Sequence, residues 1–104
     1  MITIVETDTF RTQAAKVWNQ QEYDKLIAFL AHYPNSGAIV PGSGGVRKLR
    51  WPGLQRGKRG GIRVIYYRNR ADELWLITLY AKQQRETMSA EALAKLRKGI
   101  DEDG

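Results

Sequence analysis

The chain opens with a short apolar stretch and continues with two helical patterns. Alternating apolar residues predict a strand over residues 2–6. Apolar residues over 10–18 then recur at the i, i+4, i+7 spacing of an amphipathic helix. Asn19 precedes Glu22 at the spacing of a capping box, and the helix that begins here must end before Pro34, which lacks a backbone N–H. We therefore expect a strand followed by a helical hairpin.

The middle of the chain changes to the two-residue period of β-strands. Residues 34–46 are rich in Gly, Pro and Ser and predict a loop. Strands are predicted over 46–51, 62–69 and 74–80, and the last is nearly all apolar, as is typical of a strand covered on both faces. The segment 53–61 contains four glycines and three cations and predicts a loop between the first two of these strands.

A third helical pattern completes the chain. Ser89 is the expected N-cap, with Met88 and Leu93 at the spacing of a hydrophobic staple. Residues 101–104 are predicted to be a frayed acidic tail. The expected order is β-α-α-β-β-β-α, an α+β fold in which the helical hairpin and the C-terminal helix pack on a small antiparallel sheet. At this length, residues 1–104 form one domain.

Composition excludes several classes of function. The 104 residues include no Cys and one His, which excludes a disulfide scaffold, a thiolate metal site and a Cys nucleophile. No apolar run approaches the ~20 residues that a membrane span needs. The N-terminus has neither the basic nor the apolar region of a secretory signal, so we expect a cytoplasmic protein without a membrane partner.

The net charge of +6 is concentrated in one segment. Residues 47–85 hold eleven of the 17 basic residues and two of the 11 acidic ones, while both flanking segments are slightly acidic. Such a concentration is typical of an electrostatic footprint for a polyanion. The alternative is a solvated, arginine-rich sheet face.

Two nucleotide-binding motifs can be tested in this segment, and both fail. A Walker A loop needs Ser or Thr after Gly57-Lys58, but the next residue is Arg59. A dinucleotide fingerprint needs three spaced glycines that open a helix, whereas residues 42–47 lack the last glycine and lead into a strand. We therefore expect no cofactor, and we identify no metal ligands.

The basic segment instead predicts a surface that grips an RNA backbone. Strand alternation places Lys48 and Arg50 on the face opposite to Arg47. Four cations from neighbouring strands are expected to converge: Lys48, Arg50, Arg63 and Lys82. Three tyrosines offer rings for base stacking: Tyr66, Tyr67 and Tyr80. Tyr66 and Tyr67 are adjacent in one strand, so one of these two must face the core. No helix carries the charge needed to enter a DNA major groove.

One metal-free reaction suits such a surface. A ribose 2′-OH can attack its neighbouring phosphate if a base, an acid for the leaving oxygen and cations for the developing charge are present. A lysine can be the base if neighbouring cations lower its pKa well below ~10.4. His32 lies near the end of a helix and is expected to be a surface or capping residue, and the three tryptophans are expected to pack in the core.

Three runs of sequence resemble one family of proteins. The runs GGVRKLRW, GKRGGIRVIYY and LITLYAK, within residues 44–82, resemble the HigB branch of the RelE superfamily of toxins. The resemblance implies a type II toxin that acts as a ribosome-dependent mRNA endonuclease in the A site, in contact with 16S rRNA. It also implies a HigA-like, DNA-binding antitoxin as partner. The toxin would contact operator DNA only through this antitoxin.

The resemblance also implies residue roles. The catalytic set that it suggests lies on the strands and just after the last of them: Lys48, Arg50, Arg63, Tyr80 and Lys82. The set that it suggests for RNA and ribosome binding surrounds them: Arg47, Lys58, Arg59, Tyr67 and Arg85. The chain departs from the family at Gln83-Gln84 and has Met88 near the place of a late tyrosine in RelE, so the base and the acid stay open.

Two other functions stay open beside this one. The same fold could bind rRNA without cleaving it, or it could be a gyrase-directed toxin of the ParE branch. The run GKRGGIRVIYY argues against the ParE branch.

Overall fold

A computed structural model describes residues 2–52, 61–81 and 88–103. All seven predicted elements are present, together with one unpredicted strand of two residues inside the loop 34–46. The elements in chain order are β1 (Thr3–Glu6), α1 (Asp8–Ala15), α2 (Gln20–His32), β2 (Ala38–Ile39), β3 (Arg47–Trp51), β4 (Ile62–Arg70), β5 (Glu73–Ala81) and α3 (Ala90–Asp103).

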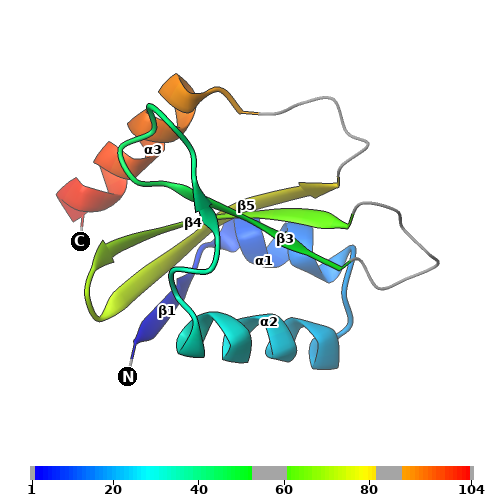
Figure 1. The fold of residues 1–104 in the computed structure, drawn as a ribbon. Coiled ribbons are helices and arrows are strands. Elements are labelled where there is room, and N and C mark those ends of the chain that lie inside the picture. The colour runs from blue at the N-terminus through cyan, green and yellow to red at the C-terminus, as the bar shows by residue number, and fades with distance from the viewer. Residues whose placement is uncertain (1, 53–60, 82–87, 104) are drawn as a thin grey trace.

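The strands form one sheet in the order β1-β5-β4-β3-β2. Strands β2 to β5 pair with their neighbours in antiparallel fashion, but β1 lies parallel to β5. The α+β class is thus confirmed, whereas the expected antiparallel sheet is in fact mixed. The reason is the helical hairpin, which carries the chain from β1 across the sheet to its other edge, so that β1 lies beside the last strand (Figure 1).

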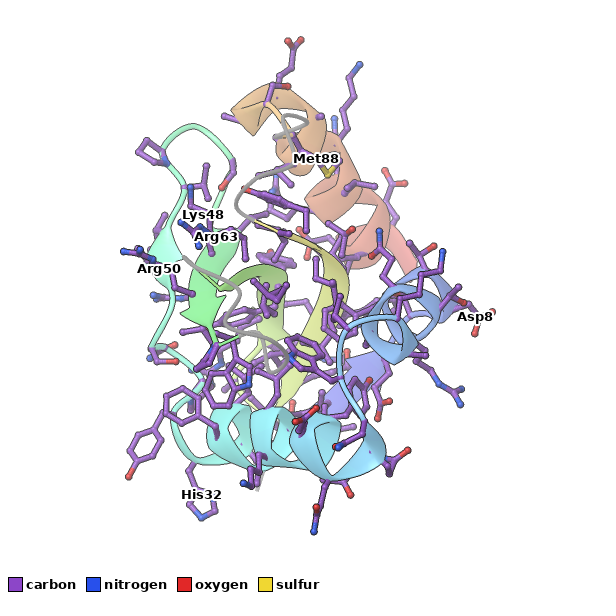
Figure 2. All side chains as sticks on the ribbon, turned by 90° about the vertical axis from the view of Figure 1, so that its right-hand side faces the viewer. Asp8, His32, Lys48, Arg50, Arg63 and Met88 are labelled. Atoms are coloured by element: carbon purple, nitrogen blue, oxygen red, sulfur yellow. The ribbon has the colours of Figure 1, made fainter. Side chains whose placement is uncertain are left out.

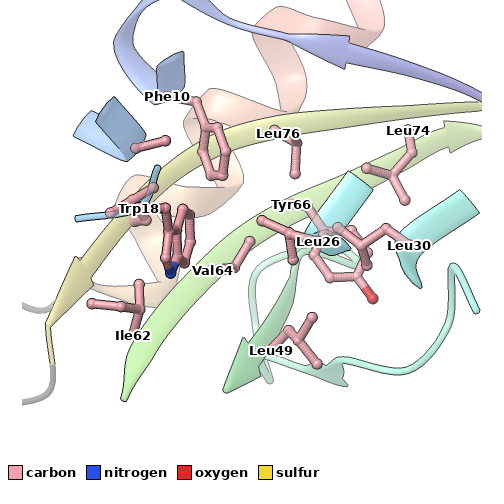
Figure 3. Packing of buried hydrophobic residues seen from close by; sticks show 12 residues of the cluster. Phe10, Trp18, Leu26, Leu30, Leu49, Ile62, Val64, Tyr66, Leu74 and Leu76 are labelled. Atoms are coloured by element: carbon pink, nitrogen blue, oxygen red, sulfur yellow. The ribbon is translucent and has the colours of Figure 1, made fainter. Parts of the chain in front are cut away.

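The helices cover both faces of this sheet. Helices α1 and α2 lie on one face and α3 lies on the other (Figure 1). Beneath α1 and α2, buried Phe10 and Leu26 pack with Val64 and Leu76 of the sheet (Figure 3). The cluster beneath α3 is smaller and is formed by Val46, Ile65, Ile77, Leu93 and Ile100. Neighbouring residues of β4 therefore enter opposite clusters, which is the alternation expected of a strand covered on both faces.

The predicted helix starts are confirmed by their hydrogen bonds. In α2, Asn19 Oδ1 accepts from the Glu22 N–H at 2.8 Å and Glu22 Oε1 accepts from the Asn19 N–H at 2.9 Å, a complete capping box. Ser89 Oγ accepts from the Ala92 N–H at 3.1 Å at the start of α3. In the described ranges, no helix has the length and apolar character needed to cross a bilayer.

The end of α3 differs from the prediction of a frayed tail. The helix runs through Asp101 to Asp103. Asp101 accepts a hydrogen bond from the Tyr67 hydroxyl at 3.0 Å and forms an ion pair with Arg97 at 2.8 Å. These contacts dock the last turn of α3 on the sheet. The acidic sequence of this turn does not by itself predict them.

Candidate functional site

Three of the predicted catalytic residues, two arginines and a tyrosine, lie in one row across three strands. Arg50 of β3 lies directly opposite Arg63 of β4, and Arg63 lies directly opposite Tyr80 of β5. Directly opposed residues share a face of the sheet, with Cβ atoms about 4.5–5.5 Å apart. We call Arg50, Arg63 and Tyr80 the basic row.

Lys48 extends the basic row along β3. It lies two residues from Arg50 and therefore on the same face. Figure 2 shows Lys48, Arg50 and Arg63 gathered on one side of the molecule. Lys48 and Arg50 are exposed, whereas Arg63 and Tyr80 are half-buried, with Tyr80 packed against the cluster beneath α3. The result is an open cationic surface with a phenol beside it.

Two cations of the basic row stand directly opposite each other on adjacent strands. Arg50 and Arg63 form this like-charged pair. Like charges at such positions repel each other, in contrast to opposite charges. The pair thus concentrates positive charge on this face of the sheet, which favours the approach of an anion.

A glycine fixes the approach of the two strands that carry this pair. Gly61 precedes β4 with a φ of +67°, and a Cβ on it would lie 2.7 Å from the carbonyl oxygen of Trp51. A side chain there would force the start of β4 away from the end of β3. Gly61, the third glycine of the run GKRGGIR, thus allows the close approach of β3 and β4 beside Arg50 and Arg63.

Four of the predicted site residues lie outside the described residues: Lys58, Arg59, Lys82 and Arg85. The described strands end beside the basic row, β3 at Trp51 and β5 at Ala81, and β4 begins there at Ile62. These three residues are directly opposed in the register and form the last row of the sheet.

Arg47, a predicted RNA-binding residue, contacts the protein itself. It lies on the other face of β3, and its Nη1 donates to the carbonyl oxygens of Gly37 at 2.6 Å and Asn35 at 3.2 Å. Arg68 donates to Asn35 Oδ1 at 2.9 Å from β4. Both guanidinium groups thus hold the loop before β2 and lie away from the basic row.

The neighbouring tyrosines of β4 have separate roles. Tyr66 is fully buried, and its hydroxyl donates to the Pro34 carbonyl at 2.8 Å and accepts from the Gly37 N–H at 2.9 Å. It is the core member of the pair, as predicted for one of the two. Tyr67 is half-buried on the α3 side, where burial and its hydrogen bond to Asp101 raise the pKa of its phenol. Tyr67 therefore stays neutral and helps to dock α3.

The remaining candidates have the roles expected of them. His32 is exposed, with Nδ1 3.0 Å from the Ala28 carbonyl oxygen in the last turns of α2. Trp18 is buried, and Trp51 and Trp75 each pack against a core cluster. Over the described ranges, His, Asp and Glu side chains form no group of three that could hold a metal ion.

One feature beyond the basic row was not predicted. A hollow of about 520 Å³ lies between α1 and α2, on the face of the sheet opposite to the basic row. At its edge the Tyr23 hydroxyl donates to Glu6 Oε1 at 2.6 Å, and burial together with this carboxylate raises the pKa of Tyr23. No local sequence signal marks this hollow, because it arises from the packing of two helices and a strand.

Comparison with known proteins gives a likeness of structure. No family model matches the chain. A solved structure, a copper-bound mutant of a toxin from Helicobacter pylori, is similar with a TM-score of 0.47 and 14% sequence identity. The similarity covers 83% of this chain and 100% of that one. At this identity the likeness concerns the fold alone.

Proposed function

We propose that this chain is the toxin of a type II toxin–antitoxin pair and that it cleaves mRNA in the ribosomal A site. The observation that carries the proposal is the basic row, in which Arg50, Arg63 and Tyr80 are directly opposed across three strands. The resemblance of the same segments to the HigB branch supports it from the sequence.

The basic row suits one backbone phosphate. Guanidinium groups bind phosphate oxygens through paired N–H donors. Two arginines on directly opposed residues, with Cβ atoms about 5 Å apart, can bracket a single phosphate, and exposed Lys48 adds a third cation on the same face. Lys48 and Arg50 are exposed, so an extended strand can reach both of them. This exposure favours single-stranded RNA over a small nucleotide.

The chemistry is transesterification within the RNA. The 2′-oxygen attacks the adjacent phosphorus, the bond from phosphorus to the 5′-oxygen breaks, and a 2′,3′-cyclic phosphate and a free 5′-hydroxyl result. The 2′-OH gives up a proton to a base, and the leaving 5′-oxygen takes one from an acid. Tyr80 and Lys82 are our candidates for proton transfer. Arg50 and Arg63 stabilise the extra negative charge of the phosphorane, an effect of about 3–4 kcal/mol for one well-placed donor.

The partners follow from the same proposal. The ribosome presents the mRNA, and contacts with 16S rRNA would use the exposed cations around the basic row. A HigA-like antitoxin would neutralise the chain and bring it to operator DNA, to which the toxin itself would not bind.

The first prediction is that cleavage needs both ribosomes and Arg63. Primer extension on a defined mRNA, with purified protein in a translation mixture, should show cuts that disappear when ribosomes are omitted. Arg63→Ala should lower the cleavage rate about 100-fold, because it removes a cation from the transition state. Arg70→Ala is the matched control, since Arg70 lies on the same strand but pairs with Glu73 at the other end of the sheet.

Each other outcome names another function. Cuts without ribosomes would identify a free ribonuclease. Ribosome binding without cuts would identify a non-catalytic rRNA-binding module. Gyrase-dependent cleavage of plasmid DNA, with mRNA intact, would identify a ParE-like toxin.

A further inference from the structure

Strand β5 reverses the direction of its side chains part-way along. Leu74 and Leu76 enter the cluster beneath α1 and α2, whereas Trp75 and Ile77 face α3. Continued alternation would place residue 80 with Leu74 and Leu76, away from the basic row. Instead, Leu79 enters the cluster beneath α1 and α2, and Tyr80 faces α3.

A one-residue bulge causes this reversal. Thr78 lies opposite Ile65 and Leu76 lies opposite Tyr66, so that Ile77 is an extra residue in β5. A bulge of this kind changes the face to which every later side chain points. Relative to the pairs Tyr66–Leu76 and Tyr67–Trp75, the bulge brings Tyr80, and not Leu79, opposite Arg63, while a second register shift lies nearer the turn, between Tyr67 and Arg70.

The bulge is held from the far side of the sheet. Strand β1 ends at Glu6, opposite Leu76, and α1 continues along the edge of β5 (Figure 1). Gln13 Oε1 of α1 accepts from the Thr78 hydroxyl at 2.8 Å and from the Leu79 N–H at 3.2 Å. A backbone N–H that a strand would otherwise pair is thus satisfied by a side chain, two residues after the bulged Ile77.

We propose that Gln13 is a positioning residue for Tyr80. Its side-chain oxygen fixes residues 78 and 79 in the shifted register, and this register places the Tyr80 phenol beside Arg63. Gln13 lies on α1, on the other side of β5, and touches no RNA. The inference rests on the proposed role of Tyr80 in cleavage.

The second prediction uses a pair of substitutions at Gln13. Gln13→Met has nearly the same shape but no acceptor oxygen, whereas Gln13→Glu keeps an acceptor. Gln13→Met should lower kcat for ribosome-dependent cleavage about 10- to 100-fold with KM unchanged, because a small displacement of a reacting group has an effect of this size. Gln13→Glu should retain activity within about threefold of the wild type. Gln21→Met, at an exposed position of α2, is the matched control and should behave as the wild type.

A double-mutant cycle separates positioning from general destabilisation. In a Tyr80→Phe background, Gln13→Met should cause no further loss of kcat, because both changes act through the same hydroxyl. Losses that multiply would overturn the proposal. Thr78→Val removes one of the two hydrogen bonds and should give a smaller loss of the same kind, which keeps the test available if Gln13→Met does not fold.

A spectroscopic readout works whether or not the chain cleaves RNA. With ¹³C-labelled tyrosine, the Tyr80 ring signal, assigned with Tyr80→Phe, should shift in Gln13→Met and keep its position in Gln13→Glu. The signals of Tyr23 and Tyr33 should stay fixed in both. An unmoved Tyr80 signal overturns the inference. A shifted signal in a protein without any cleavage activity supports the positioning of Tyr80 and contradicts the proposed function alone.

Discussion

Two arginines of β4, Arg63 and Arg70, differ in the charge of the residue that lies opposite them. Arg63 faces another cation, Arg50, whereas Arg70 faces Glu73 and pairs with it at 3.1 Å. The second arrangement stabilises the protein, and the first concentrates positive charge on one face of the sheet. This concentration of charge is the residue-level reason to propose anion binding at the Arg63 end of the sheet.

The third prediction concerns the acid stability of the β4–β5 hairpin. Glu73 accepts from Trp75 Nε1 at 3.0 Å and from Asn69 Nδ2 at 2.7 Å, and these bonds, with a smaller effect of Arg70, lower its pKa. A lowered pKa contributes stability at pH values above the ordinary pKa of Glu, and this stability is lost as the pH falls toward the folded value. Glu73→Gln should therefore be less stable than the wild type at pH 7, and the difference should narrow by pH 3.

Thermal unfolding of both proteins between pH 3 and 7 measures this difference. Glu102→Gln, at an exposed residue near the end of α3, should shift the melting temperature by a similar amount at every pH. A gap between Glu73→Gln and the wild type that widens toward pH 3 would contradict the assignment.

At the scale of the elements, glycines determine where two strands can meet. The fourth prediction is that Gly61→Ala lowers the free energy of unfolding by about 1–3 kcal/mol, because alanine at a φ of +67° is strained and its Cβ would contact the Trp51 carbonyl. Gly99→Ala should have the opposite sign. Gly99 lies inside α3 with open space around it, so alanine should stabilise the helix by about 0.5–1 kcal/mol. Urea unfolding of the two variants compares them directly, and a neutral Gly61→Ala would contradict the close approach of the strands.

The elements also show which parts of the structure a sequence can predict. The caps at Asn19 and Ser89 were predicted because their hydrogen bonds join residues three apart. The strand β2 was missed because two residues give no period. The parallel pairing of β1 with β5 was missed because it joins residues about 70 positions apart in the sequence.

The candidate site was predicted in part, for the same reason. The face shared by Lys48 and Arg50 follows from alternation within one strand. The opposition of Arg63 and Tyr80 depends on the register between β4 and β5, which shifts at Ile77 and again between Tyr67 and Arg70, and nothing in the apolar run of β5 signals these shifts. Alternation separated Arg47 from Lys48 and Arg50, but its contacts with Asn35 and Gly37 could not be predicted, because they are tertiary.

For the molecule as a whole, the fold gathers three cations of the basic segment, Lys48, Arg50 and Arg63, on one side. Figure 2 places Lys48, Arg50 and Arg63 on one side and Asp8, on α1, on the other. The acidic residues before position 47 lie on β1, on the first turn of α1 and on α2. The cations of the basic row lie on the sheet face that α1 and α2 do not cover. A charge distribution of this kind orients a protein toward a polyanion before contact.

The fifth prediction tests whether binding is confined to that side. The affinity for single-stranded RNA falls with salt, and the slope of log K against log [KCl] is about −0.7 for each neutralised phosphate. A 2′-O-methyl oligoribonucleotide lacks the attacking hydroxyl, so its binding can be followed by fluorescence anisotropy between 50 and 200 mM KCl without cleavage. Arg63→Ala and Arg50→Ala should each make the slope shallower, by up to about 0.7, because each removes one of the two guanidinium groups that bracket the phosphate. Arg70→Ala should leave the slope unchanged, because Arg70 is paired with Glu73 and lies at the other end of β4. Equal changes of the slope in all three variants would mean that diffuse positive charge holds the RNA. The basic row would then not be a specific binding site.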